Sequence, residues 1–248
     1  MSSNIDYAII LAGGKGERLR PHTDNKPKPM VEVGGKPIIV YQLERLQSVG
    51  VKEVVIACSY KWEAIKEYLG NGEKLGMKIS YSVETEPLGR GGGIKKAMQF
   101  LPDNWEDALV LNGDILSNSS LEDLVAQHYD KKALVTLTVV PLKSPYGIVE
   151  FNENNEVLGF REKPILPHWI NAGMYVFSKE IEPLLPEVGD HETETFPKLP
   201  KEKFLVFQSE DYWRGVDTVK DLTEAEKEVV EIFGQPSVSG GIGFTLTA

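Results

Sequence analysis

The chain has 248 residues, of which 41% are hydrophobic and 26% are charged, and its formal net charge is −10. This composition is that of an ordinary globular protein, which excludes a disordered, collagen-like or coiled-coil chain. The excess of acidic residues argues against nucleic acid as a partner, because phosphate backbones bind basic surfaces.

Cys58 is the only cysteine, so an internal disulfide and a cysteine zinc site are both excluded. The first apolar run lacks the basic region and cleavage pattern of a signal peptide. No apolar run reaches the roughly 18 residues that a membrane span needs. We therefore expect a cytoplasmic protein without a membrane partner.

The first 130 residues alternate between short apolar runs and segments with helical spacing. The pattern predicts strands at Tyr7–Ala12, Glu53–Ala57, Lys78–Val83 and Ala108–Leu111, and helices at Ile38–Ser48, Trp62–Leu69, Ile94–Leu101 and Leu121–Tyr129. Such alternation favours an α/β fold with a Rossmann-like, doubly wound sheet.

From Leu134 this alternation ends, and the sequence predicts short β-strands with few helices between them. We interpret them as a mixed continuation of the sheet plus a small β-rich substrate lobe, followed by a last helix at about Val219–Ile232. One domain is expected over residues 1–233, with a nucleotide-binding half (about 1–130) and a sugar-phosphate-binding half (about 131–233). The Gly/Ser-rich segment 234–248 is expected to be a flexible tail.

The most informative segment is Leu11–Arg20, LAGGKGERLR, which directly follows the first strand. Its three glycines allow close approach of the backbone to an anion, and its basic side chains add positive charge. A triphosphate cradle and a plain glycine-rich turn are equally compatible with the glycines alone. The dinucleotide fingerprint is absent because Leu19 replaces its third glycine, and Walker A is absent because Pro37 follows Gly35-Lys36. The missing Walker A argues against a kinase or other NTPase.

Three further residues are candidates for charge-based chemistry. Lys28 lies between two prolines that hold the backbone extended, so it is either directed at the loop or part of a surface turn. Asp114 follows the fourth predicted strand, where it is either a Mg²⁺ ligand or a turn cap. Asp217 precedes the last predicted helix, where its alternative role is an N-cap.

At this point the sequence resembles the sugar-1-phosphate nucleotidylyltransferases, which join a nucleoside triphosphate to a sugar 1-phosphate and release pyrophosphate. The resemblance runs over about residues 6–230 through ordered motifs: LAGGKGERLRP, KPKPMVEVGGKPII, EPLGRGGGIKKA, LNGDIL, YGIVEF, REKP, NAGMYVF and YWRGVDTVKDL. Many relatives show W-x-D-x-G-T near the end. Here the order is W-x-G-x-D-T, which resembles the glucose-1-phosphate cytidylyltransferases.

The resemblance implies a role for each matching residue. It places Arg18, Lys28 and Asp114 in catalysis, and Asp114 with Asp217 on Mg²⁺. It places Leu11, Ala12, Gly13, Gly14, Gly16, Glu84, Pro87, Gly89 and Asn112 on the nucleotide. It places Gly147, Glu162, Lys163, Asn171 and Gly173 on the sugar phosphate. The oligomeric state stays open, and a homo-oligomer is one option.

Glu84 lies in the segment that resembles the family's base-reading strip. A carboxylate only accepts hydrogen bonds, and guanine offers it two adjacent donors whereas cytosine offers one amine. We therefore predict GTP as the nucleotide, with a mannose- or heptose-type 1-phosphate as the acceptor by resemblance to guanylyltransferases. Cytidylyl, uridylyl or thymidylyl transfer to glucose 1-phosphate or another sugar phosphate remains an alternative, as does a non-catalytic regulatory subunit. Relatives usually carry a small residue at the position of Arg90. We expect Arg90 either to contact ribose or phosphate or to lie in solvent.

Overall fold

The structure is a computed structural model that describes residues 5–234. Of the predicted tail, only Gly234 is described, and 235–248 lie outside the described residues. Within this range, no helix is long and apolar enough to cross a membrane. The helices and strands are β1 (Tyr7–Ala12), β2 (Glu32–Val33), β3 (Lys36–Pro37), α1 (Ile38–Ser48), β4 (Glu53–Cys58), α2 (Trp62–Leu69), β5 (Lys78–Val83), α3 (Gly89–Met98), β6 (Asp107–Asn112), β7 (Ile115–Ser117), α4 (Leu121–Lys131), β8 (Val135–Lys143), β9 (Ile148–Phe151), β10 (Val157–Arg161), β11 (Ile165–Ser178), α5 (His191–Glu194), β12 (Phe204–Gln208), β13 (Trp213–Gly215) and α6 (Val219–Phe233).

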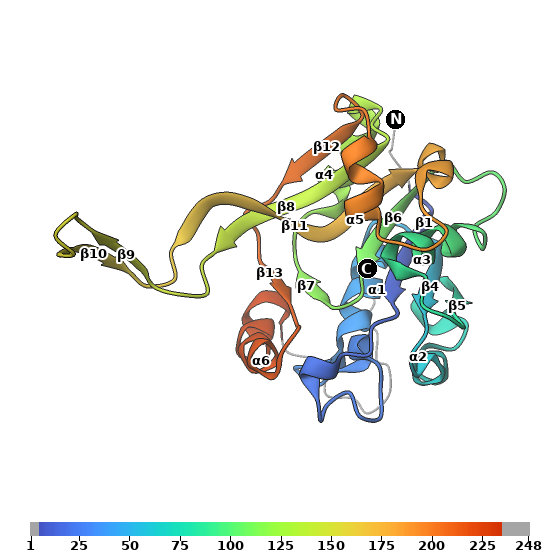
Figure 1. Ribbon diagram of the computed structural model, residues 1–248. Helices are drawn as coiled ribbons and strands as arrows, with labels where there is room; N and C mark the ends of the chain where they lie inside the picture. Colours follow the sequence, from blue (N-terminus) through green and yellow to red (C-terminus); the bar gives the residue numbers. More distant parts are fainter. Residues whose placement is uncertain (1–4, 235–248) are drawn as a thin grey trace.

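A seven-stranded sheet forms the centre of the molecule, with the order β12-β8-β11-β6-β1-β4-β5 (Figure 1). β6, β1, β4 and β5 are parallel to one another, whereas β11 is antiparallel to both β6 and β8. The two halves of the chain thus contribute strands to one sheet. The mixed α/β sheet predicted from the sequence is confirmed.

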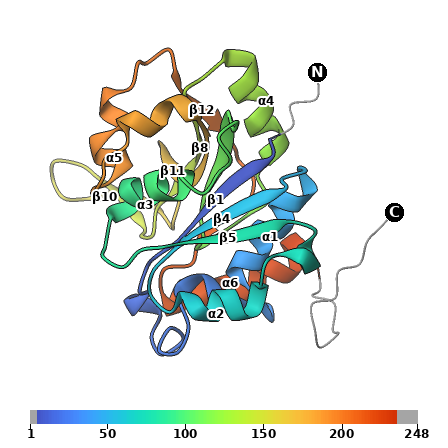
Figure 2. The same ribbon diagram turned by 90° about the vertical axis from the view of Figure 1, so that its right-hand side faces the viewer.

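Alternating side chains of the central strands bury both faces of the sheet. Ile10 of β1 packs in the core that contains α1, α2 and α4, while the adjacent Ile9 packs in the core that contains α3. Figure 2 shows α1, α2 and α6 on one side of the sheet and α3 and α5 on the other. A parallel sheet needs this two-sided cover because its strands are apolar on both faces.

The helix α3 differs from its prediction, since it begins at Gly89 rather than Ile94 and ends at Met98. Glycine is a poor helix former, so sequence propensity alone disfavours the early start. Tertiary packing explains it, because a Cβ at Gly92 would overlap the backbone of Glu187, and one at Gly91 would lie 2.8 Å from the backbone nitrogen of His191. The glycines therefore let α3 approach the segment before α5 closely.

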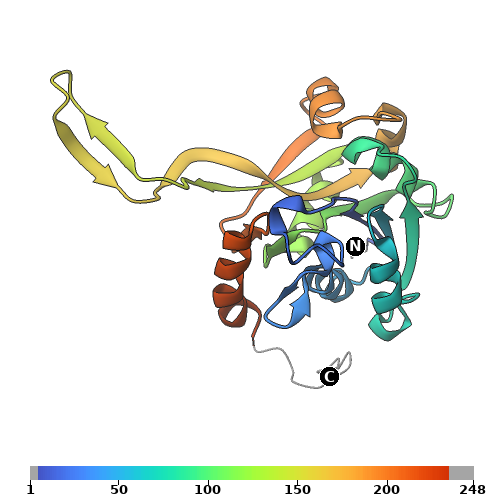
Figure 3. The same ribbon diagram turned by 60° about the horizontal axis from the view of Figure 1, so that its bottom comes forward.

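Residues 144–164, which connect β8 to β11, form an arm. Its strands β9 and β10 pair antiparallel with each other as a separate two-stranded sheet. Figures 1 and 3 both show the arm extending away from the body of the molecule. The β-rich half predicted from the sequence is thus divided between the central sheet and this projecting arm.

Candidate active site

A cavity of about 730 Å³ opens at the carboxyl ends of the parallel strands. Its lining residues are Leu11, Gly13, Gly14, Lys15, Ala57, Ser59, Tyr60, Glu84, Thr85, Glu86, Pro87, Gly89, Arg90, Asn112 and Asp114. They lie at or just after the carboxyl ends of β1, β4, β5 and β6 and at the start of α3. Chain connections leave β1 and β6 in opposite directions. This is the switch point at which open α/β sheets bind ligands.

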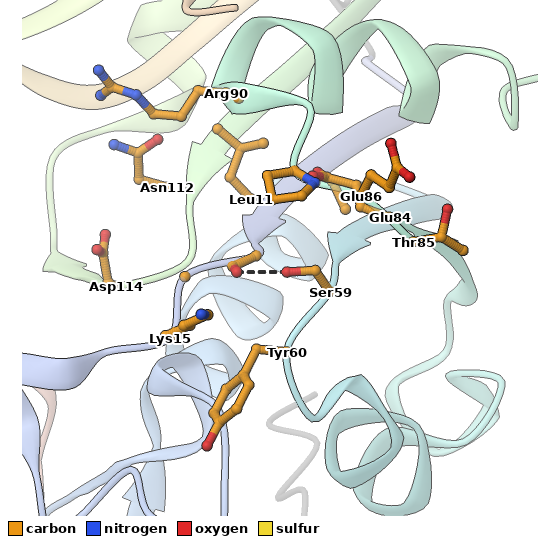
Figure 4. A pocket seen from close by; sticks show the side chains of 15 residues that line it. Leu11, Lys15, Ser59, Tyr60, Glu84, Thr85, Glu86, Arg90, Asn112 and Asp114 are labelled. Carbon is orange, nitrogen blue, oxygen red and sulfur yellow. Dashed lines mark hydrogen bonds between the residues drawn. The ribbon is translucent and has the colours of Figure 1, made fainter. Parts of the chain in front are cut away.

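The glycine loop after β1 forms one wall of this cavity (Figure 4). The Ser59 hydroxyl donates to the carbonyl of Gly13 at 2.6 Å, which fixes the start of the loop. Gly16 has a φ of +64°, and a Cβ there would lie 2.9 Å from the Thr23 methyl group. Thr23 Oγ1 donates to the Gly16 carbonyl at 2.8 Å, so Gly16 closes the loop rather than lining the cavity.

Two carboxylates meet at one ammonium group beside the loop. Lys28 Nζ lies 2.6 Å from Asp114 Oδ2 and 2.5 Å from Asp217 Oδ1. Arg18 Nη2 lies 3.0 Å from the same oxygen of Asp217. Lys28 is 8% exposed, so its charge is held in place near the cavity. The structure therefore brings together the four charged residues that the sequence singled out.

Backbone contacts fix the positions of Asp114 and Asp217 relative to each other. Strand β7, just after Asp114, pairs antiparallel with β13, just before Asp217. The Val216 N–H donates to the Asp114 carbonyl at 3.0 Å and connects the two turns directly. Thr218 and Asp221 form a capping box at the start of α6, which fixes the chain immediately after Asp217. The N-cap of α6 is thus Thr218, and the Asp217 side chain is directed at Lys28 instead.

The pKa of Asp217 reflects this environment. Burial acts to raise it, but the hydrogen bond and charge of Lys28, followed by the charge of Arg18, outweigh burial and lower the pKa below its ordinary value. Asp217 is therefore ionised at neutral pH.

The carboxylate pair fits a hard divalent cation that shares its ligands with a substrate. Among residues 5–234, no group of three or more His, Cys, Asp or Glu side chains is arranged to hold a metal ion. Mg²⁺ commonly binds through one or two carboxylates and completes its shell with phosphates and water. Asp114 and Asp217 match that donor set.

Glu84 lies in the cavity wall opposite Asn112 and Asp114 (Figure 4). Its Oε2 accepts a hydrogen bond from the Leu88 N–H at 3.1 Å. Its Oε1 lies against Gly93 of α3, where a Cβ would approach to 2.6 Å. Glu84 therefore organises the turn before α3 as well as facing the cavity.

Arg90 contacts two carboxylates from a distant segment, so it does not simply lie in solvent. It pairs with Asp190 at 2.5 Å and with Glu192 at 2.9 Å. Glu192 Oε1 also accepts from Asn171 Nδ2 at 2.9 Å. Burial acts to raise the pKa of Asp190, but hydrogen bonds from the Glu192 N–H and from Arg90 lower it overall. This network joins the cavity to β11.

The residues predicted to hold the sugar phosphate are divided between two places. Asn171 and Gly173 lie in β11, and Gly173, with a φ of +68°, would overlap the Asn112 side chain if it carried a Cβ. This pair is therefore next to the cavity. Gly147, Glu162 and Lys163 lie on the arm instead, outside the set of residues that line the cavity.

Several functional candidates were not identified from the sequence. Ser59, Tyr60, Thr85 and Glu86 line the cavity because they follow β4 and β5, and their position after predicted strands was the available signal. Glu192 had no such signal, because its contacts with Arg90 and Asn171 depend on tertiary packing. Ala12 is 2% exposed and lies in the core, so its backbone alone is available to the site.

Sequence comparisons show which known proteins this chain is similar to. The Nucleotidyl transferase family profile matches residues 7–231. A mannose-1-phosphate guanylyltransferase of Mycobacterium tuberculosis is 35% identical over 253 residues, covering 98% of this chain and 70% of the relative. A mannose-1-phosphate guanylyltransferase catalytic subunit beta of Dictyostelium discoideum is 41% identical over 223 residues, covering 87% of this chain and 62% of the relative. The chain thus spans between three fifths and three quarters of the length of these relatives.

Solved structures show the same fold. HddC from Yersinia pseudotuberculosis, in a crystal structure with GMP-PN, aligns with a TM-score of 0.72 and 27% identity over 90% of this chain and 99% of HddC. A glucose-1-phosphate thymidylyltransferase, described as putative, from Bacillus anthracis aligns with a TM-score of 0.71 at 18% identity, covering 95% of this chain and 97% of that one. The second likeness concerns the fold alone.

Proposed function

This chain belongs to the nucleotidyl transferase family, and from that premise we propose that it transfers a guanylyl group from GTP to a mannose- or heptose-type sugar 1-phosphate. The products are a GDP-sugar and pyrophosphate. The observation that carries the proposal is the Lys28 ammonium between Asp114 and Asp217, beside a glycine loop at the switch point of the sheet. Anionic phosphates and a divalent cation are the ligands that such an arrangement binds.

The reaction needs no general base from the protein. The acceptor phosphate is already an anion at neutral pH, and one of its oxygens attacks the α-phosphorus of GTP as the bond to pyrophosphate breaks. The chain's task is to position the two phosphates in line and to balance their charge. Arg18, Lys28 and the loop amides would bind the departing pyrophosphate, whose charge increases in the transition state.

Asp114 and Asp217 would hold Mg²⁺, the metal we propose for the site. When bound, the ion neutralises charge on the phosphate oxygens that it contacts. Both carboxylates already lie within hydrogen-bond distance of one ammonium nitrogen, so they converge on a single position. Lys28 compensates their mutual repulsion, which explains how two acidic groups are held together in the protein without further ligands.

Two observations support guanine as the base. The relatives named above are mannose-1-phosphate guanylyltransferases, and the HddC structure was determined with GMP-PN. Glu84 faces the cavity, and Oε1 does not contact the Leu88 N–H. A carboxylate only accepts hydrogen bonds, which suits the donor edge of guanine.

The test is a pyrophosphate-release assay with GTP, CTP, UTP, dTTP and ATP, each against mannose 1-phosphate, a heptose 1-phosphate and glucose 1-phosphate. We expect GTP to give the highest kcat/KM and activity to disappear when EDTA removes the divalent ion. A preference for CTP would favour the cytidylyl alternative, and a preference for UTP or dTTP would exclude Glu84 as the base-reading group. Tight nucleotide-sugar binding without pyrophosphate release would indicate the regulatory subunit instead.

A further inference from the structure

Glu84, the residue proposed above to face the base, directly follows strand β5 (Figure 4). β5 pairs with β4 as far as Val83 and Cys58, and the Glu84 N–H donates to the Cys58 carbonyl at 2.8 Å. The backbone of Glu84 is therefore held by the sheet. Within residues 5–234, its side chain accepts one hydrogen bond, from the Leu88 N–H at 3.1 Å. A carboxylate can accept about four, so the described protein groups leave acceptor sites unused.

Helix α3 contacts both the side chain of Glu84 and the backbone next to it. Gly93 lies against Glu84 Oε1, which a Cβ at Gly93 would approach to 2.6 Å. Lys96 lies about one turn further along the same face of the helix, because residues three apart in a helix are neighbours. Its Nζ donates to the carbonyl of Val83 at 2.6 Å. One face of α3 thus contacts the Glu84 carboxylate and the peptide group that joins Val83 to Glu84.

The charge of Lys96 is not used by an ion pair. Lys96 is partly buried, and among residues 5–234 no carboxylate lies within salt-bridge distance of its ammonium group. The adjacent Lys95, in contrast, pairs with Glu187 at 2.7 Å. A partly buried ammonium group whose hydrogen bond goes to a single backbone carbonyl is costly to desolvate. The Val83 carbonyl is therefore the contact that accounts for the position of Lys96.

The Cys58 thiol supports the closeness of Lys96 to Glu84. Burial is the largest cause of the rise of its pKa to about 12, and the charges of Glu84 and Glu63 add to the rise. The charge of Lys96 acts in the opposite direction and lowers this pKa. The charges of Glu84 and Lys96 thus act on one buried group at the end of β4.

We propose that Lys96 is a positioning residue for base recognition, whose ammonium group fixes the Val83 carbonyl and thereby orients the Glu84 carboxylate. Guanine presents N1–H and its exocyclic amine side by side, so a carboxylate that accepts from both must be held in one orientation. Rotation of the peptide group between Val83 and Glu84 would turn the carboxylate away from that edge. The identity of the base rests on the proposed function, whereas the placement of Glu84 rests on the contacts of α3 with β5.

The first experiment measures the binding of GTP and of inosine triphosphate by calorimetry, with Mg²⁺ and without an acceptor. Inosine triphosphate keeps N1–H and lacks the exocyclic amine. The wild type is expected to bind GTP about ten- to a hundredfold more tightly, which is the effect of one hydrogen bond to a charged group. In Lys96→Met this ratio is expected to fall by about tenfold, because the carboxylate is no longer aligned with both donors. An unchanged ratio in Lys96→Met would overturn the proposal.

Three further variants separate positioning from stability. Lys96→Arg keeps a donor for the Val83 carbonyl and is expected to restore most of the ratio. Lys95→Met is the matched control and should keep the wild-type ratio, since Lys95 contacts the Leu185 carbonyl at 3.1 Å and Glu187 instead. Lys96→Gln has a shorter side chain that does not reach the carbonyl, and it decides the question if Lys96→Met does not fold. A lower melting temperature with an unchanged ratio would show that the contact is only structural.

Turnover distinguishes this proposal from the proposed function. With mannose 1-phosphate as acceptor, Lys96→Met is expected to raise the KM for GTP about tenfold and to keep kcat, because the contact serves the base and not the reacting phosphates. If the ratio falls as expected but the wild type transfers no nucleotide to any acceptor, the role of Lys96 stands and the proposed function fails. A wild type that binds both nucleotides equally would contradict base recognition by Glu84 and the role of Lys96 with it.

Discussion

Arg90 Nη1 donates a hydrogen bond to Glu192 Oε1 at 2.9 Å, although the two residues are 102 positions apart. The same oxygen accepts from Asn171, so the guanidinium positions a residue expected to contact the sugar. A small residue in place of Arg90 leaves Glu192 and Asn171 without this support. The contact therefore gives a structural role to an arginine at a position where the family resemblance led us to expect a small side chain.

The first prediction concerns this network. Arg90→Ala is expected to raise the KM for the sugar 1-phosphate by about ten- to a hundredfold, because a hydrogen bond to a charged group contributes about 1.5–3 kcal/mol. The kcat and the KM for GTP are expected to change less. Lys95→Ala is the matched control, since Lys95 is on the same helix but pairs with Glu187. A change confined to the KM for GTP would show that Arg90 serves the nucleotide.

The second prediction concerns the carboxylate pair. Asp114→Asn and Asp217→Asn are each expected to reduce kcat/KM by roughly 10²–10³, because a neutral amide binds a divalent ion poorly. Circular dichroism should show an unchanged fold. Activity of either variant within tenfold of wild type would remove that residue from the metal site. If only Asp217→Asn stays active, the second ligand comes from elsewhere.

The third prediction separates two cations of the glycine loop. Arg18 contacts Asp217 at 3.0 Å, whereas Lys15 lines the cavity wall. Arg18→Ala is therefore expected to impair GTP turnover far more than Lys15→Ala in steady-state kinetics. Equal losses would mean that the loop contributes only diffuse positive charge.

The fourth prediction concerns nucleotide choice. Glu84→Gln keeps an acceptor for the Leu88 N–H but replaces one carboxylate oxygen with a donor. The ratio of kcat/KM for GTP to that for UTP is expected to fall by about tenfold or more, a change worth about 1.4 kcal/mol. Glu86→Gln, in the same wall, is the control that should retain the ratio. An unchanged ratio in the Glu84 variant would show that its side chain serves only the turn.

The fifth prediction concerns acid stability. Burial lowers the pKa of His191 from 6.5 to about 4, although Asp190 acts to raise it and Arg90 acts to lower it. The ring packs edge-on against Phe196 at 4.9 Å between centroids, and within the described residues neither of its nitrogens has a hydrogen-bond partner. The folded protein keeps His191 neutral, whereas the unfolded chain binds a proton below about pH 6.5.

Above pH 6.5 the neutral His191 therefore does not reduce the free energy of unfolding. As the pH falls toward 4, the free energy of unfolding decreases by roughly 3 kcal/mol at most. In urea unfolding, His191→Phe is expected to flatten the fall in unfolding free energy between these values. His22→Gln, which changes an exposed histidine, is expected to keep the wild-type slope. A slope unaffected by His191→Phe would contradict this explanation.

The sequence correctly predicted those helices and strands whose bounds depend on nearby residues. The bounds of β1, β5, α1 and α2 match the sequence prediction, because apolar periodicity marks them directly. The start of α3 was wrong by five residues, since the reason for its glycines lies in the backbone of Glu187, almost a hundred positions away. At the start of α3, long-range packing overrides the low helix propensity of glycine.

The sequence likewise predicted some residues of the candidate site and missed others. Asp114 was identifiable from its place at the end of a predicted strand, where open α/β sheets bind ligands, whereas Asn112 and Glu84 were expected only from the family resemblance. Glu192 and the position of Lys163 were not identifiable, because an ion pair across 102 residues and the direction of an arm leave no local pattern.

Lys28 and Asp217 are 189 positions apart in the chain, and their contact has a consequence for the order in which the protein matures. A ribosome releases the glycine loop and Lys28 early and Asp217 near the end. The second carboxylate reaches its place only after β13 has paired with β7, a contact of high sequence separation that forms at a large cost in loop entropy. A nascent chain can thus form the segment around Lys28 before the carboxylate of Asp217 is available to contact it.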